Sequence, residues 1–183
     1  FGQTPIITMI SDGDCSGGSP KVVEIYADGA VDFANYSLEI QSNDNTTWGS
    51  TLNLANLGSV TDNFVYVYKD DPSFADEFPS ASNTFAASSR AVDFNGNDSI
   101  RIIEVASGNT IDEFGVDGVN GTGEAWEYTD GYAKRNDGTG PDSIFSVGNW
   151  TFSKGGLDGE GTCQGGTAFE SIISTNDFTL SSR

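Results

Sequence analysis

The sequence contains no histidine, and this absence removes the residue that proteins use most often as a general base, as a zinc ligand and as the partner of a serine or cysteine nucleophile. Basic residues are scarce: 8 Lys and Arg stand against 27 Asp and Glu, and the formal net charge is -19. Because cationic side chains supply most of the affinity for nucleic acid, we expect no nucleic-acid partner. No stretch approaches the roughly 20 apolar residues of a membrane-spanning helix, so we expect no membrane insertion.

Cysteine is almost absent as well. The two cysteines, Cys15 and Cys163, lie near opposite ends of the sequence and form no CxxC pair, which gives no basis for a redox motif or a thiolate metal site. A disulfide between them is the simplest interpretation, and it requires an oxidising compartment. We therefore predict a secreted or cell-surface protein.

Short segments rich in β-branched and aromatic residues recur along the chain, and its length suits one domain. The clearest is 63–69, in which tyrosines and valines alternate with the period of a strand. With 23 glycines available for turns, this spacing predicts an antiparallel β-sandwich with one short helix at 70–78. We expect strands at 6–10, 21–27, 36–42, 52–60, 63–69, 100–105, 110–114, 125–128 and 150–152.

The last part of the chain differs in composition from the rest. Residues 155–166 are rich in glycine, and residues 167–183 are rich in serine and threonine and lack a core of their own. We therefore predict a sandwich over 1–155 and a flexible linker and tail over 156–183, closed back by the Cys15–Cys163 disulfide. Such a linker indicates further domains in the parent protein.

The order of several motifs resembles the lamin-tail domain in its secreted bacterial form. This resemblance covers about residues 6–152, and it implies an immunoglobulin-like β-sandwich that serves as a non-catalytic module beside hydrolases in secreted and surface proteins. Residues 174–180 are similar to the joint that precedes a type IX secretion sorting domain, which implies a surface protein of a Bacteroidetes bacterium. The matching segments are 23–26, 36–38, 64–67, 97–100, 111–115, 126–135 and Trp150.

A glycine-rich acidic loop at 117–124 is the best candidate for a metal site. Its side-chain oxygens and its turned carbonyls are the ligands that Ca²⁺ prefers, and acids across the sheet end, Glu113 among them, could join it. The alternative is an ordinary hairpin turn with solvated acids. Two further candidates, Asp12 with Asp14 and residues 136–142, are more typical of turns. The predicted calcium ligands are Asp112, Asp117, Asn120, Glu124 and Asp130.

Aromatic residues are the candidates for contact with a ligand, because flat rings can stack on the C–H faces of sugars. Trp48 follows a polar loop and is the better of the tryptophans, whereas Trp126 and Trp150 lie in strand patterns and are expected in the core. Tyr132 is the second predicted ligand-binding residue.

Three functions are compatible with these observations. The first is a non-catalytic binding or adhesion module, for a polysaccharide or surface glycan, that is stabilised by calcium. The second is a structural or protein-interaction spacer without a small-molecule ligand. The third is a glycan hydrolase that uses a pair of carboxylates, a mechanism that needs no histidine, although no two acids are placed across a cleft by the sequence. We expect the first and expect no catalysis.

Overall fold

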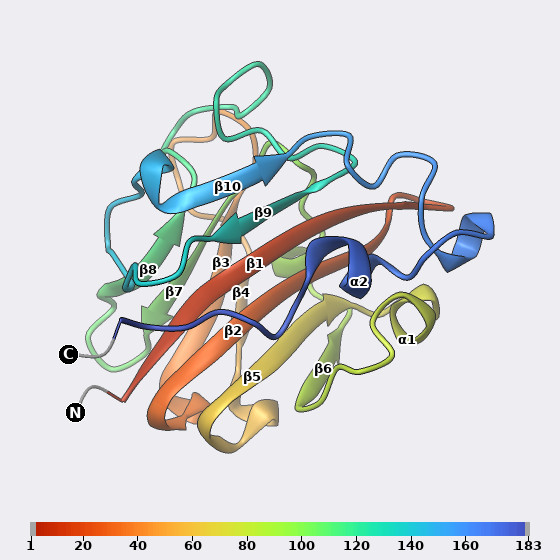
Figure 1. The fold of residues 1–183 in the computed structure, drawn as a ribbon. Helices are drawn as coiled ribbons and strands as arrows, with labels where there is room; N and C mark the ends of the chain where they lie inside the picture. Colours follow the sequence, from red (N-terminus) through yellow and green to blue (C-terminus); the bar gives the residue numbers. More distant parts are fainter. Residues whose placement is uncertain (1–2, 182–183) are drawn as a thin grey trace.

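The computed structural model describes residues 3–181 and shows an all-β sandwich (Figure 1). One sheet has six strands in the order β10-β9-β1-β2-β5-β6, and the other has four in the order β4-β3-β7-β8. The predicted fold class is confirmed. The pairing is antiparallel except between β5 and β6, which run parallel. No helix within residues 3–181 has the length and apolarity needed to cross a membrane.

The strands are more extended at the start of the chain than the sequence predicted. β1 continues to Cys15, five residues beyond the end of the strand predicted at 6–10, and it pairs with β2 along most of its length with two register shifts. The strands are β1 (Thr4–Cys15), β2 (Ser19–Asp32), β3 (Tyr36–Gln41), β4 (Thr51–Asn53), β5 (Ser59–Lys69), β6 (Thr84–Ala87), β7 (Ser99–Glu104), β8 (Thr110–Phe114), β9 (Tyr132–Arg135) and β10 (Trp150–Ser153).

Helices are short and lie between strands or after the last one. The predicted short helix is present as α1 (Ser73–Glu77), and a second, α2 (Phe169–Ile173), follows β10. Single 3₁₀ turns occur at η1 (Phe33–Asn35), η2 (Ala55–Leu57), η3 (Arg90–Val92), η4 (Val147–Asn149) and η5 (Thr162–Gln164).

The main core lies between the two sheets. Val23, Val65 and Val67 face it from the six-stranded sheet, as the period of two requires. The ring of Phe114 lies at its centre, in edge-on contact with Trp150 at 4.9 Å between ring centroids. Trp126 and Trp150 are both buried, which confirms their predicted place in the core. The strand predicted at 125–128 is wrong, because residues 125–126 form a turn and residues 127–128 have no regular structure.

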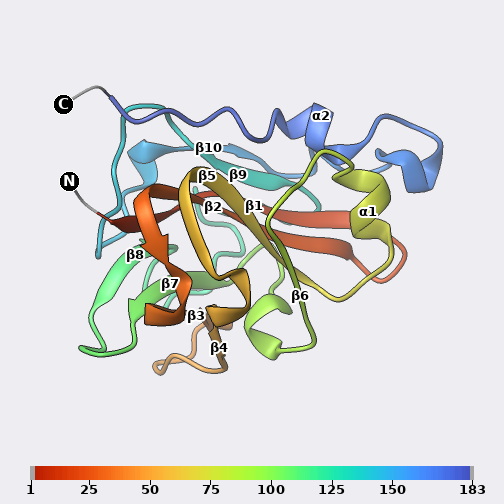
Figure 2. The same ribbon diagram turned by 90° about the horizontal axis from the view of Figure 1, so that it is seen from below.

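The outer face of the six-stranded sheet is buried too, because the end of the chain packs on it. Figure 2 shows the tail and α2 along one side of this sheet and the four-stranded sheet on the other. The side chains of Leu157, Phe169, Ile173 and Phe178 are buried there against strand residues such as Tyr66. The predicted flexible linker is therefore wrong: a few widely spaced apolar residues, hidden among Ser, Thr and Gly, are enough to attach the tail.

The predicted disulfide between Cys15 and Cys163 is confirmed, with 5.8 Å between the Cα atoms. It joins the tip of the β1–β2 hairpin to η5. Glu77 at the end of α1 is fully buried beside it. The Glu77 carboxylate accepts hydrogen bonds from the hydroxyl of Thr162 and from the backbone N–H groups of Cys163 and Phe169, so one side chain fastens both ends of the 162–169 segment.

Candidate ligand-binding groove on the four-stranded sheet

Asp112, a predicted calcium ligand, is fully buried and already paired. Its carboxylate accepts hydrogen bonds from the Arg135 guanidinium at 2.7 Å and from the backbone N–H groups of Ile7 and Asp142. Burial raises the pKa of Asp112 to about 6, while Arg135 and the two N–H groups favour the charged form, so the carboxylate is ionised at neutral pH. With both oxygens used by these donors, Asp112 is a structural anion and the prediction for it is wrong.

The three predicted ligands in the 117–124 loop do not converge. Asp117 accepts a 2.6 Å hydrogen bond from the Gln41 amide. The Asn120 side-chain oxygen accepts from the Asn97 amide and from the N–H of Thr122. Glu124 is exposed to solvent. The loop is thus held by neutral amide contacts, which is closer to the ordinary-turn alternative than to a cation cage.

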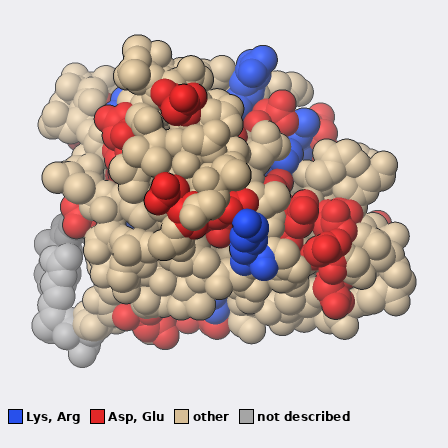
Figure 3. Space-filling view, turned by 90° about the horizontal axis from the view of Figure 1, so that it is seen from above, with Lys and Arg blue, Asp and Glu red and all other residues tan. Residues whose placement is uncertain are grey.

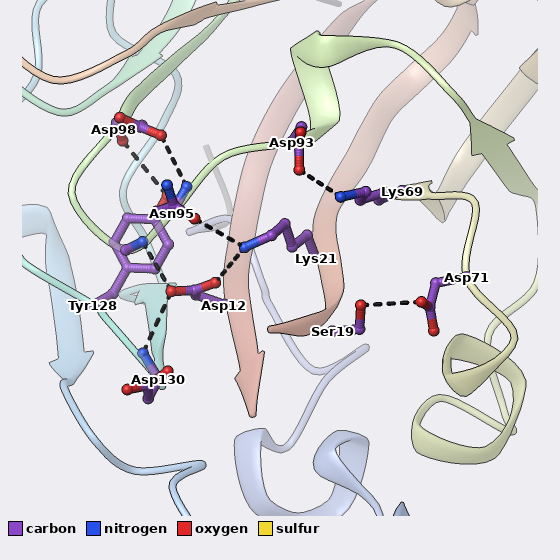
Figure 4. Close-up of polar contacts among 11 residues, drawn as sticks. Asp12, Ser19, Lys21, Lys69, Asp71, Asp93, Asn95, Asp98, Tyr128 and Asp130 are labelled. Atoms are coloured by element: carbon purple, nitrogen blue, oxygen red, sulfur yellow. Dashed lines mark hydrogen bonds and ion pairs between the residues drawn. The ribbon is translucent and has the colours of Figure 1, made fainter. Parts of the chain in front are cut away.

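Asp130, the fifth predicted ligand, lies near Asp12 at the far end of β1 (Figure 4). Asp12 itself pairs with the buried ammonium of Lys21 at 2.7 Å and accepts from the N–H of Gly96. Burial, followed by the charges of Asp12 and Asp14, raises the pKa of Asp130. Figure 4 shows Lys21 also directed at Asn95, so this network braces the loop before β7 against the β1–β2 hairpin.

Within residues 3–181, one group of three or more acidic or cysteine side chains is close enough to share a metal ion: Cys15, Glu77 and Cys163. Both sulfurs are bonded to each other there. The predicted calcium ligands therefore form no common site, and calcium binding stays a prediction without an assigned location.

Tyr132, one predicted ligand contact, belongs to the six-stranded sheet, whereas Trp48, the other, lies in the loop between β3 and β4 of the four-stranded sheet. Tyr132 is on β9, where it packs against the cluster under the tail. Trp48 precedes β4, and the Arg101 guanidinium carbon lies 4.2 Å from the centroid of its ring. The two residues cannot contact one ligand, and the structure separates a Trp48 site from a Tyr132 site.

A groove of about 410 Å³ opens next to Arg101. Its floor comes from β7 and β8, where Arg101 is the cross-strand partner of Glu113. Its lip is apolar and carries two exposed side chains, Val116 at 41% and Ile144 at 75%. The residues that give the groove its chemistry are Arg101, Glu113, Val116, Asp117, Ile144 and Phe145.

The Arg101 side chain is fixed in this groove by its neighbours. Its Nε and Nη2 atoms donate to one carboxylate oxygen of Glu39 at 2.8 and 2.7 Å, and its Nη1 donates to the Thr110 hydroxyl at 3.2 Å. Glu39 is opposite Arg101 on β3, so the pair crosses the sheet. Arg101 thereby supplies a fixed planar surface between Trp48 and the groove.

Glu113 has a different environment. Within residues 3–181, neither a hydrogen bond nor an ion pair involves its carboxylate, although the side chain is half-buried. The pKa of Glu113 rises to about 7. Burial is the largest cause and the negative charge of Asp117 is the second, while the positive charge of Arg101 opposes the rise. The groove thus holds a carboxyl group close to half protonated at neutral pH.

The sequence identified only part of this groove. Of the residues that line it, Asp117 and, as an added acid, Glu113 were named for a calcium loop, and Trp48, which was named as a ligand contact, lies next to the groove against Arg101. Arg101, Ile144 and Phe145 were missed, because 141–146 lies far along the chain and has no strand pattern. The exposed apolar residue in that polar loop, Ile144, was the available signal.

A second, smaller hollow of about 250 Å³ lies beside the tail and is lined by Tyr132, Lys134 and Asp177 among others. Both of its cations are already used, since Lys134 pairs with Asp177 at 2.6 Å and donates to the Ser174 carbonyl, and Arg135 pairs with Asp112. Its charged groups hold the tail in place.

Comparison with known proteins gives no further guide. No protein-family model, no curated protein and no solved structure matches the chain. The resemblance to lamin-tail domains therefore stays a prediction.

Proposed function

We propose that this chain is a non-catalytic binding module of a secreted or cell-surface protein, and that the groove beside Trp48 binds a glycan. The observation that carries the proposal is the groove itself, whose volume of about 410 Å³ lies within the range of small-molecule sites, roughly 300–1,000 Å³. It combines an apolar lip with carboxylates and a fixed arginine, and a sugar ring offers the matching apolar C–H faces and hydroxyl donors.

The charge of the molecule supports a neutral or cationic glycan. On the face drawn in Figure 3, acidic side chains gather in several groups and basic side chains are few. With a net charge of -19, the surface repels sulfated and uronic polysaccharides at long range. The disulfide supports an oxidising location outside the cytoplasm.

Affinity electrophoresis in gels that contain neutral and amino polysaccharides tests this proposal. Retardation by at least one polysaccharide is expected, and Trp48→Ala should weaken it. Tyr132→Ala is the matched control, because it removes an aromatic ring of the opposite sheet and should leave retardation unchanged. If no polysaccharide retards the folded protein, the glycan proposal is wrong and the spacer function replaces it.

One observation favours a second function. Glu113, with its pKa of about 7, shares the groove with Asp117, and a proton-holding carboxyl beside a second carboxylate is the pair that glycoside hydrolysis requires. Against this, the Asp117 side chain is engaged by Gln41. Release of reducing ends from a polysaccharide, abolished by Glu113→Gln, would establish catalysis and replace the binding-only proposal.

A further inference from the structure

The Glu113 carboxylate lacks a partner in a groove where the other charged groups have one. Arg101 is occupied by Glu39 and Thr110, and Asp117 by Gln41. The backbone N–H of Glu113 is also used, since it donates to the Asp142 carbonyl at 2.9 Å. What the groove offers to a ligand is therefore one half-buried carboxyl group that no protein donor occupies.

The surroundings of this acceptor are acidic on one side and apolar on the other. The charged groups that face Glu113 are Arg101 on β7, which Glu39 on β3 neutralises, Asp117 in the loop after β8, and Asp112 on β8, which pairs with Arg135. The three negative groups in this set outnumber the two positive ones, so the balance around Glu113 is negative. The apolar lip excludes water from part of the carboxylate, which strengthens its attraction for a cation.

We propose that the groove selects amino sugars, with the ammonium group of the sugar bound to Glu113 and an apolar face of the ring against the lip at Phe145 and Ile144. This inference rests on the proposed function and names the class of glycan. An ammonium carries three donors on one compact charge, so it can satisfy Glu113 and approach Asp117 together.

Related sugars lack one part of this match. A glucose unit has a hydroxyl in place of the ammonium and gains no charge-assisted hydrogen bond. An N-acetylated unit is neutral and adds a bulky acyl group at the same atom. The raised pKa of Glu113 is consistent with the assignment, because a bound cation would favour the charged form that the empty groove disfavours.

The test compares three β-1,4-linked oligosaccharides of equal length that differ only at C2: glucosamine, N-acetylglucosamine and glucose. Titration calorimetry at neutral pH should show glucosamine binding about tenfold or more tighter than the others, as expected for a hydrogen bond to a charged group. Glu113→Gln should remove this preference. Glu124→Gln is the control, since it removes the same charge from an exposed position in a neighbouring loop. Glucosamine binding should be strongest near neutral pH, because Glu113 takes up a proton on acidification and the ammonium group of the sugar loses its proton at alkaline pH.

The outcomes separate the two claims. Equal binding of glucose and glucosamine oligomers, or a glucosamine preference that survives Glu113→Gln, overturns the amino-sugar inference and leaves the glycan module intact. Failure of the glucosamine oligomer to bind while a polysaccharide gel still retards the protein has the same meaning. If neither oligomers nor gels bind, both proposals fall.

Discussion

The Arg135–Asp112 pair shows what one buried charge contributes to this molecule. Both side chains are at most 1% exposed, and the Arg135 guanidinium also donates to the carbonyls of Ile7 and Gly140. It thereby joins β9, β1, β8 and the loop before η4. Each buried charge is compensated by the other, because neither is in contact with solvent. Removal of one partner alone would therefore leave an uncompensated buried charge and destabilise the folded protein.

Asp112→Asn should lower the free energy of unfolding by about 3–5 kcal/mol, since it leaves the buried guanidinium uncompensated. Urea unfolding followed by circular dichroism measures the loss. Asp93→Asn provides the comparison, because the Lys69–Asp93 pair is 38% and 44% exposed and exposed pairs contribute about 1 kcal/mol or less. Equal losses of unfolding free energy in the two variants would show that the buried pair stabilises the protein no more than the exposed pair does.

Glu113 makes the stability of the protein depend on pH in the opposite sense to an ordinary ion pair. Its pKa rises from 4.5 in the unfolded chain to about 7 in the folded protein, so the folded state binds the proton more tightly. The associated stability is complete below about pH 4.5 and is lost as the pH rises through about 7.

Glu113→Gln should therefore raise the melting temperature above that of the parent at pH 8, and this difference should shrink to nothing near pH 4. Differential scanning fluorimetry across this range measures it, with Glu124→Gln as the control that removes the same charge from an exposed position. A gap for Glu113→Gln that does not vary with pH would contradict the raised pKa.

Among the elements, the tail is the part that the sequence described least well. The β1–β2–β5 strands follow from their periodicity, and the sandwich could be predicted from them together with the turn residues. The tail could not, because Phe169, Ile173 and Phe178 are buried by contacts with residues more than 80 positions earlier, and no local pattern records such contacts. The groove could not be predicted for a similar reason, because its apolar lip comes from a loop without periodicity.

The disulfide makes the attachment of the tail testable. Cys15→Ser with Cys163→Ser should reduce the free energy of unfolding by about 2–5 kcal/mol, because the link closes a loop of 148 residues in the unfolded chain. Hydrogen exchange should show the larger loss of protection in residues 157–178 and little change in β3 and β7. Uniform loss across both sheets would mean that the tail is not a separate cooperative unit.

Considered as a whole, the molecule carries far more negative charge than its basic residues compensate. Self-repulsion of this kind destabilises the compact state and is relieved by any cation that binds or screens it. Since the predicted ligands of Ca²⁺ are dispersed, general screening and specific binding have to be distinguished.

Millimolar CaCl₂ should raise the melting temperature more than MgCl₂ at the same ionic strength if calcium binds the native state specifically, and chelator should reverse the gain. Scanning fluorimetry with both salts measures this difference. Identical curves for the two salts would show that calcium acts by general screening alone and does not bind a specific site of the native state.

The covalent link at Cys163 also determines how the molecule would respond to mechanical tension. A pull applied at residue 181 can peel away residues 164–181, including α2, but it then reaches the bond to Cys15 and passes directly into the tip of the β1–β2 hairpin. Residues 16–162 lie inside the covalent loop and are shielded from that pull. Once the tail is released, further extension would have to pull on β1, which pairs with β2 and β9, while the four-stranded sheet and its groove lie inside the covalent loop.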